Sequence, residues 1–271
     1  MQLELGGKSP NIVFDDADFA QAVAGGALGV FYNQGENCNA GSRLLVHASI
    51  YDAYIDALSA AAQKIRILPP LDEKSQMGAL ISAAHRDKVA GYVELGREED
   101  LTLRCGGTAP GDGHFQRGHW YLPTVLADVK PTHRVFQEEI FGPVCTVTEF
   151  HDEDEAIALA NGTAFCLAAG AWTKSVHRAL RCTQELQSGY GWINNYNRTP
   201  VEAPPRRREV VRLRARLRAA SDRGVHDVEV GAVVARAVRG LVQELNRAPF
   251  SRKALLIRPG ASPALGRGLR W

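Results

Sequence analysis

Cys38 is the residue whose setting points most directly to chemistry. It stands in NQGENCNAGSR, among amides, a carboxylate and two glycines, whereas a packing cysteine usually has apolar neighbours. A cysteine attacks carbonyl carbon as its thiolate, which requires a partly exposed setting and usually a base elsewhere in the fold. Gly35 and Gly41 leave room for a substrate beside it. The flanking residues alone still allow a structural thiol, so a second feature is needed.

Glu4 is the candidate base. It lies in LELGGKSPNIVF, where it alternates with two leucines at the end of an apparent strand that a pair of glycines breaks. A carboxylate at a strand end beside two glycines can reach into a cleft as a general base. The alternative is a solvated glutamate at a strand edge, which is the commoner case for such a residue standing alone.

The composition is that of an ordinary globular protein of one or two domains. Of the 271 residues, 45% are hydrophobic and 23% are charged, so the chain can bury a substantial core. The five cysteines are odd in number and show no CxxC, which argues against a disulfide framework or a zinc site and favours a reducing compartment. The sequence shows no secretory leader pattern and no apolar run of bilayer length, so we expect a cytoplasmic protein without a membrane partner.

Helices alternate with short apolar strands as far as about Pro205. In residues 50–67, aromatic and aliphatic residues recur at spacings of three and four, which predicts a helix. Similar patterns predict helices at 18–31, 154–161 and 176–186. Short apolar, β-branched or aromatic runs predict strands at 44–47, 144–150, 167–173 and 191–194. The alternation predicts an α/β fold with a largely parallel sheet flanked by helices. The loop-forming stretch 106–118 is expected at the surface.

Five motifs follow one another in the order and approximate spacing of the aldehyde dehydrogenase superfamily, which residues 1–204 resemble almost continuously. They are LELGGKSPNIVF, FYNQGENCNAGSRLLVH, EEIFGPVCTVTEF, LAAGAWTK and WINNYN. The resemblance implies an aldehyde dehydrogenase-like catalytic domain that oxidises an aldehyde to a carboxylic acid with NAD or NADP. It also implies that the first residues of the chain are the end of a cofactor domain.

The same resemblance assigns roles to single residues. Cys38 is then the nucleophile that forms a thiohemiacetal with the aldehyde, and Glu4, at the family's spacing from it, activates the water that hydrolyses the resulting thioester. Glu139 and Phe141, in EEIFGPV, match the residues that contact the nicotinamide ribose and ring. Asn194, in WINN, matches an element of the motif, and we assign it no catalytic role. The chemistry agrees, because attack by sulfur divides one hard oxidation into two easier steps.

The cofactor site is expected to be incomplete in this chain. The family builds most of its cofactor domain from sequence that precedes LELGGK, and only a few residues precede Glu4 here. The glycine-containing stretches GGALG and GYGWIN do not have the spacing of a dinucleotide fingerprint. We therefore expect little or no NAD(P)-dependent activity from this chain alone. The alternative function is an inactive truncated fragment with at most an interaction role or residual thiol esterase activity.

Residues 205–271 depart from the family, and arginine dominates from Arg206 in RRREVVRLRARLRAA. Codons displaced by one nucleotide permit GGVKSSGFGR in this segment and EYTTSKSV in place of residues 224–232, both in register with the family. We interpret 205–271 as an out-of-frame, Arg/Ala-rich tail. A one-base insertion or deletion near the codons of Pro204 and Pro205, in the genome or through a sequencing error, would produce it.

The tail bears on partners. A basic segment can bind nucleic acid or anionic lipid, but shifted GC-rich codons produce this composition, and aromatic residues for base stacking are nearly absent. We expect a poorly ordered tail that binds neither nucleic acid nor membrane. The family is homo-oligomeric and its subunits pair through the C-terminal strand that this tail replaces, so we expect impaired assembly.

The aromatic residues around WINNYN bear on the substrate. Tyr190, Trp192 and Tyr196 offer aromatic surface for a cationic substrate, and WINNYNRTPVEAP resembles forms in relatives that act on amino and betaine aldehydes. Packing of these rings in the core is the alternative. The choice between NAD and NADP depends on sequence outside this chain.

Overall fold

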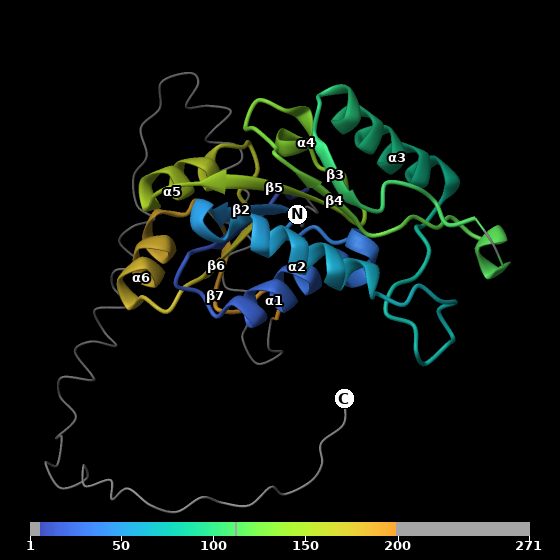
Figure 1. The fold of residues 1–271 in the computed structure, drawn as a ribbon, viewed down its shortest axis with the longest axis horizontal. Coiled ribbons are helices and arrows are strands. Elements are labelled where there is room, and N and C mark those ends of the chain that lie inside the picture. Colours follow the sequence, from blue (N-terminus) through green and yellow to red (C-terminus); the bar gives the residue numbers. More distant parts are fainter. Residues whose placement is uncertain (1–5, 112, 199–271) are drawn as a thin grey trace, which may run out of the picture. The chain divides into compact units, whose positions relative to one another are not determined.

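One seven-stranded sheet organises the chain, in the order β3-β4-β5-β2-β1-β6-β7 (Figure 1). The computed structural model describes residues 6–111 and 113–198, which belong to a single compact unit. The strands are β1 (Pro10–Val13), β2 (Arg43–His47), β3 (Thr102–Cys105), β4 (Thr124–Ala127), β5 (Val144–Phe150), β6 (Ala168–Trp172) and β7 (Tyr190–Ile193). Only β3 runs antiparallel to its neighbour, and every other pairing is parallel. The predicted α/β class with a largely parallel sheet is confirmed.

Six α-helices flank the sheet in the described part of the chain. They are α1 (Phe19–Phe31), α2 (Tyr51–Gln63), α3 (Ala83–Glu98), α4 (Arg134–Gln137), α5 (Glu153–Asn161) and α6 (Val176–Glu185). Four of them begin at a capping side chain that accepts a backbone N–H three residues further on, which satisfies one of the unpaired donors at a helix start. The caps are Asp18, Ser82, Asp152 and Ser175.

Alternation along the central strands divides the core into two layers. Val13 and Leu44 pack with α1 and α2 on one face, where the Tyr54 hydroxyl donates to the Ala22 carbonyl oxygen at 3.0 Å. Figure 1 shows α1 and α2 side by side. Ile12 and Leu45 face the other layer, which contains side chains of α3, α4, α5 and α6. Both layers are needed because a parallel sheet must be covered on its two faces.

The elements agree with the predicted ones where the patterns were regular. The helices predicted at 18–31, 50–67, 154–161 and 176–186 are α1, α2, α5 and α6; α1, α2 and α6 are shorter than predicted, and α5 begins one residue earlier. The strands predicted at 44–47, 144–150, 167–173 and 191–194 are β2, β5, β6 and β7. Three strands and two helices were not predicted: β1, β3, β4, the longest helix α3 and the four-residue helix α4. No helix of the described residues has the length and apolar character needed to cross a bilayer.

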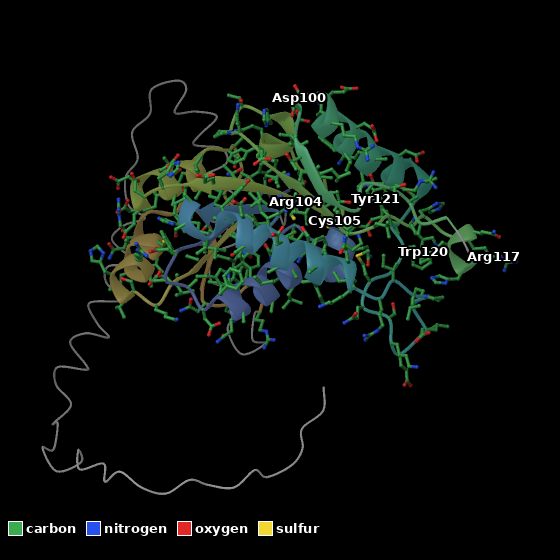
Figure 2. All side chains as sticks on the ribbon, in the orientation of Figure 1. Asp100, Arg104, Cys105, Arg117, Trp120 and Tyr121 are labelled. Carbon is green, nitrogen blue, oxygen red and sulfur yellow. The ribbon has the colours of Figure 1, made fainter. Side chains whose placement is uncertain are left out.

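The stretch 106–118 lies mostly at the surface, as predicted. It contains one 3₁₀ turn, Gly113–Gln116. The Trp120 indole N–H donates to the Arg117 carbonyl oxygen at 2.6 Å, and Figure 2 shows these two residues away from Cys105 on β3. Trp120 also packs against the rings of His114 and Phe115, so the loop has a small core of its own.

The candidate residues share one edge of the sheet. Residues 6–9 precede β1, 36–42 precede β2, 138–143 precede β5 and 162–167 precede β6. These four strands are parallel neighbours, in the order β5-β2-β1-β6. The segments before them therefore meet at the amino edge of the sheet. Many α/β proteins bind ligands at the opposite, carboxyl edge.

Candidate functional site

The turn formed by residues 37–40, here called the Cys38 turn, is in direct backbone contact with the glycine pair Gly6 and Gly7 before β1. A Cβ built on Gly7 would lie only 2.1 Å from the carbonyl oxygen of Cys38. Cys38 itself is partly exposed, and the turn around it is closed by N–H donation from Ala40 to the Asn37 carbonyl oxygen at 2.9 Å. Only glycine allows the two segments to approach so closely.

A left-handed turn leads into the Cys38 segment. Asn33, Gln34 and Gly35 have φ angles of 51°, 46° and 73°, and residues other than glycine rarely adopt such positive values. A Cβ on Gly35 would lie 2.0 Å from the carbonyl oxygen of Gly142, so this turn packs against the segment before β5. The side chain of Asn33 donates to the Glu36 carbonyl oxygen at 2.8 Å, which fixes the turn locally.

Glu139 reaches the same glycine pair from the segment before β5. Its Oε1 accepts the backbone N–H of Gly7 at 2.8 Å. Its Oε2 would be 2.2 Å from a Cβ on Gly6, so the carboxylate lies flat against the glycine backbone. Gly7 thus contacts both Cys38 and Glu139, two of the residues singled out from sequence.

Phe141 has a strained backbone and an accessible ring. Its φ angle is 61°, and its side chain is among the exposed large hydrophobic ones at 36%. The His85 Nε2 atom lies 2.6 Å from the Phe141 carbonyl oxygen, and the two rings meet edge to face at 5.9 Å. An exposed aromatic ring beside a carboxylate is suited to contact a flat ligand.

Two buried cations stand behind the glycine pair. Arg43 is fully buried and donates to the carbonyl oxygens of Lys8, Leu159 and Ala160 at 2.7 to 2.8 Å, with its guanidinium over the Phe136 ring. Burial lowers its pKa to about 9. Among the residues that the structure describes, the Nζ of Lys8 has no hydrogen-bond partner. Burial, together with the nearby Arg43 charge, lowers the pKa of Lys8 to about 7.

Cys38 differs from the other cysteines in exposure. All five cysteines lie in the described part of the chain, none is in a disulfide, and the other four are buried. Burial raises the pKa of the Cys105 and Cys145 thiols, and it raises the pKa of Cys182 to about 11, so the thiolate is disfavoured at all three positions. Among the residues described, no group of three or more His, Cys, Asp or Glu is placed to hold a metal ion.

The structure brings three of the four predicted site residues to one edge, and the fourth lies outside the described residues. Cys38, Glu139 and Phe141 belong to segments that touch through Gly7, Gly35 and Gly142. Glu4 is not described, although Gly6 follows it by two positions. Its role as base stays a prediction. The tail 205–271 also lies outside the described residues.

Asn194 lies at the opposite edge and has a structural role. Its side chain accepts the Thr173 N–H at 2.9 Å and donates to the Thr173 carbonyl oxygen at 2.8 Å, which joins the ends of β6 and β7. Beside it, the Asp16 carboxylate accepts from the Thr173 hydroxyl, from two backbone N–H groups and from Arg178. Internal bonds therefore occupy these groups at the carboxyl edge.

The three aromatic residues considered for a cationic substrate do not behave alike. Tyr196 is fully buried, and Cβ atoms on Gly29, Gly41 and Gly170 would all collide with its ring. For Tyr196 the packing alternative is the correct one. Tyr190 and Trp192 are partly exposed and stack at 6.2 Å with an interplanar angle of 13°.

Sequence reasoning missed the polar residues that support the site. These are Lys8, Glu36, Arg43 and His85. Lys8, Glu36 and Arg43 lie inside the first two of the five motifs that carry the resemblance, but their residue types alone do not reveal burial. His85 gives no signal in sequence, since it lies in a mostly polar helix 47 positions after Cys38 along the chain.

The fold and the site define the class of protein: an α/β domain with a mostly parallel sheet and a cysteine-containing turn at the amino edge of that sheet. Comparison with known proteins gives the family: residues 1–205 match the model described as the aldehyde dehydrogenase family. The chain belongs to the aldehyde dehydrogenase family.

Named relatives agree with this assignment. The betaine aldehyde dehydrogenase of Brucella ovis is 50% identical over 202 residues, which cover 74% of this chain and 42% of that protein. A structure of Staphylococcus aureus betaine aldehyde dehydrogenase in complex with NAD+ is 40% identical, with a TM-score of 0.73, over 75% of this chain and 40% of that one. PnpE from Pseudomonas sp. WBC-3 is 43% identical, with a TM-score of 0.73, over 75% of this chain and 42% of its own. This chain therefore spans about two fifths of the length of these relatives.

Proposed function

We propose that the protein oxidises an aldehyde to a carboxylic acid with NAD+ or NADP+, and that Cys38 is its nucleophile. The observation that carries the proposal is the double contact of Gly7, whose backbone meets the Cys38 carbonyl oxygen and donates its N–H to Glu139. One short segment thereby joins the candidate nucleophile to a candidate cofactor contact. Membership of the aldehyde dehydrogenase family supports the reaction class.

The proposed reaction has two covalent stages at Cys38. The thiolate sulfur bonds to the aldehyde carbon and gives a thiohemiacetal oxyanion, for which the backbone N–H of Cys38 is a candidate donor. After loss of hydride from that carbon, the product is a thioester. Glu4 then takes a proton from water, the hydroxide adds to the thioester carbon, and the carbon–sulfur bond breaks to release the acid and the thiolate.

The residues before β5 fit one end of a nicotinamide cofactor. Oε1 of Glu139 is already bonded to Gly7, and this bond holds the carboxylate in place for a ribose hydroxyl. The accessible ring of Phe141 offers a surface for the nicotinamide ring. When bound, NAD+ or NADP+ would supply the hydride acceptor. The complex of the Staphylococcus aureus relative with NAD+ supports this class of cofactor.

A thiol test needs no cofactor and addresses the nucleophile directly. We expect iodoacetamide to modify Cys38 well before the four buried cysteines, as read by peptide mass spectrometry of the full chain. The chain should also hydrolyse p-nitrophenyl acetate, and Cys38→Ser should abolish that hydrolysis while the control Cys182→Ser retains it. Equal labelling of all five cysteines, or hydrolysis that survives Cys38→Ser, would overturn the assignment.

The proposed roles of Glu4 and Glu139 can be distinguished by the reaction step that each variant impairs. Glu4→Gln should slow ester hydrolysis after acylation, so that an acyl-enzyme adduct on Cys38 accumulates in intact-mass spectra. Glu139→Gln should leave ester hydrolysis largely unchanged, because its proposed partner is the cofactor. If Glu4→Gln turns over acetyl-Cys38 at the rate of the unchanged chain, Glu4 is not the base.

The substrate class is proposed from the relatives and the aromatic pair. Several similar proteins are named betaine aldehyde dehydrogenases, and the stacked rings of Tyr190 and Trp192 offer a partly exposed aromatic surface. An amino or betaine aldehyde is therefore the first class to test, since aromatic faces attract quaternary ammonium groups. The preference can be measured without turnover by comparing the concentrations of betaine aldehyde and of acetaldehyde that protect Cys38 from modification by iodoacetamide.

We further propose that residues 205–271 are encoded out of frame. The match to the family model ends at residue 205, where the displaced reading GGVKSSGFGR begins, and this coincidence supports the proposal. Resequencing the gene across the codons of Pro204 and Pro205 tests it. Codons incompatible with the displaced reading would overturn it.

A further inference from the structure

Glu36, two positions before Cys38, collects donors from three directions. Its Oε1 accepts the backbone N–H of Ile81 at 3.0 Å, and its Oε2 accepts the side-chain N–H of Gln34 at 3.1 Å. The His85 Nε2 atom lies 3.5 Å from Oε1. The Glu36 side chain is only 10% exposed, so its carboxyl group is held inside the fold. A carboxylate withdrawn from water in this way needs such donors.

His85 stands between the Cys38 turn and the segment before β5. It lies in the first turn of α3, where its backbone N–H is bonded to the N-cap Ser82 at 3.2 Å. Its Nε2 faces two groups that only accept hydrogen bonds: the Phe141 carbonyl oxygen at 2.6 Å and the Glu36 carboxylate at 3.5 Å. Nε2 therefore carries a proton, and the ring donates to Phe141 beside the Glu36 charge.

Each of the two segments that His85 contacts contains a residue in an unfavourable backbone conformation, namely Gln34, which is bonded to Glu36, and Phe141. Gln34 and Phe141 have φ angles of 46° and 61°, and such residues persist only where surrounding contacts fix them. The two segments also touch, since a Cβ on Gly35 would meet the Gly142 carbonyl oxygen. The hydrogen bonds of Glu36 and His85 are the polar contacts that accompany this approach.

We propose that Glu36 and His85 form a brace that fixes the Cys38 turn against the segment carrying Glu139 and Phe141, so that His85 is a positioning residue for the chemistry of Cys38. The inference rests on the proposed function for its catalytic consequence only. The brace connects the nucleophile to the nicotinamide contacts through α3, which is otherwise remote from Cys38 in the chain. Disturbing one end should therefore loosen the other.

Hydrogen exchange of the full chain tests the brace without any catalysis. His85→Leu should speed amide exchange about tenfold in two segments, 33–41 and 139–143, as well as in the first turn of α3. His85→Gln should restore protection, because its side-chain N–H can donate to Phe141. His47→Leu is the matched control, since His47 bonds locally to Ser49 at the carboxyl edge. Faster exchange confined to 82–88 in His85→Leu would overturn the inference.

Ester hydrolysis adds the functional readout. His85→Leu should lower the kcat for p-nitrophenyl acetate about tenfold, as a small displacement of a nucleophile does, while His85→Gln and His47→Leu stay near the unchanged chain. Glu36→Gln should act in the same direction, and its combination with His85→Leu should cost little more than either alone. Fully multiplicative effects would overturn the coupling. If the unchanged chain hydrolyses no ester, the proposed function fails, and the exchange result still decides the brace.

Discussion

The backbones of Gly7 and Cys38 approach so closely that a Cβ on Gly7 would lie 2.1 Å from the Cys38 carbonyl oxygen. This contact joins the segment before β1 to the segment before β2, two parallel neighbours in the sheet. It also explains why the motif around Glu4 carries glycine at this position. The consequence is that a small change at Gly7 should be felt at the nucleophile.

Gly7→Ala should destabilise the chain by about 1 to 3 kcal/mol and lower ester hydrolysis at Cys38, because the new methyl group overlaps a backbone oxygen. Urea unfolding followed by circular dichroism and the p-nitrophenyl acetate assay measure the two effects. Gly91→Ala is the control: in the described part of the chain, a Cβ at this position of α3 would meet nothing within 4 Å beyond its own helix. It should therefore stabilise by up to about 1 kcal/mol and leave hydrolysis unchanged. Equal behaviour of the two variants would contradict the prediction.

Lys8→Met should stabilise the chain, and most strongly at low pH. The pKa of Lys8 is about 7 in the folded chain, whereas the ordinary value for an exposed lysine, as in the unfolded chain, is 10.5. Between pH 7 and pH 10.5 the unfolded chain therefore binds a proton at Lys8 that the folded chain does not. Stability conferred by this site therefore falls as pH falls from 10.5 to 7, by at most about 1.4 kcal/mol per pH unit, and is lowest below pH 7.

The measurement is the difference in free energy of unfolding between Lys8→Met and the unchanged chain at several pH values. We expect the difference to shrink steadily from pH 7 to pH 9.5. Using the difference cancels the titration of other groups. A difference that does not vary with pH would show that Lys8 keeps its proton throughout this range.

Arg43→Met should lower the free energy of unfolding by about 2 to 4 kcal/mol. The substitution leaves the buried carbonyl oxygens of Lys8, Leu159 and Ala160 without their donor, and each unsatisfied group costs about 1 to 3 kcal/mol. Removal of a buried charge is favourable and offsets part of this cost. Arg86→Met, which breaks only an exposed pair with Asp87, should change stability by less than about 1 kcal/mol. Urea midpoints compare the two.

Tyr196→Phe should be nearly neutral, whereas Tyr196→Ala should cost about 3 to 5 kcal/mol. The ring supports Gly41 in the Cys38 segment and also Gly29 and Gly170, while its buried hydroxyl has no hydrogen-bond partner among the described residues. Removing such a hydroxyl costs little, but removing the ring leaves a cavity. A large loss in Tyr196→Phe would show that the hydroxyl is bonded after all.

Regular patterns in the sequence predicted about half of the elements, and the missed ones have physical reasons. In α3 only Val89, Val93 and Gly96 are buried, so its apolar stripe is narrow and contains a glycine. β1 and β4 are buried at all four of their positions, so neither shows an alternation, and in the four-residue β3 only Cys105 is buried. Their assignment depends on neighbouring strands that are distant in the chain.

The candidate site was predictable only where motifs carried it. Cys38, Glu139 and Phe141 follow from the resemblance, and the structure brings their segments together. Glu36 and His85 are 49 positions apart and belong to no common motif, so their pairing appears only in the fold. Tyr196 shows the opposite case, where an aromatic residue near a motif packs in the core.

The bond from Gly7 to Glu139 joins residues 132 positions apart. Closing so long a loop has an entropic cost that only the assembled sheet can offset, and contacts of this kind form late on folding pathways. We therefore expect the amino edge to be absent from isolated peptides of this chain and to form only with the assembled sheet. The rate at which the Cys38 thiol is modified therefore reports the progress of folding, because it should reach its final value only after β1, β2 and β5 have come together.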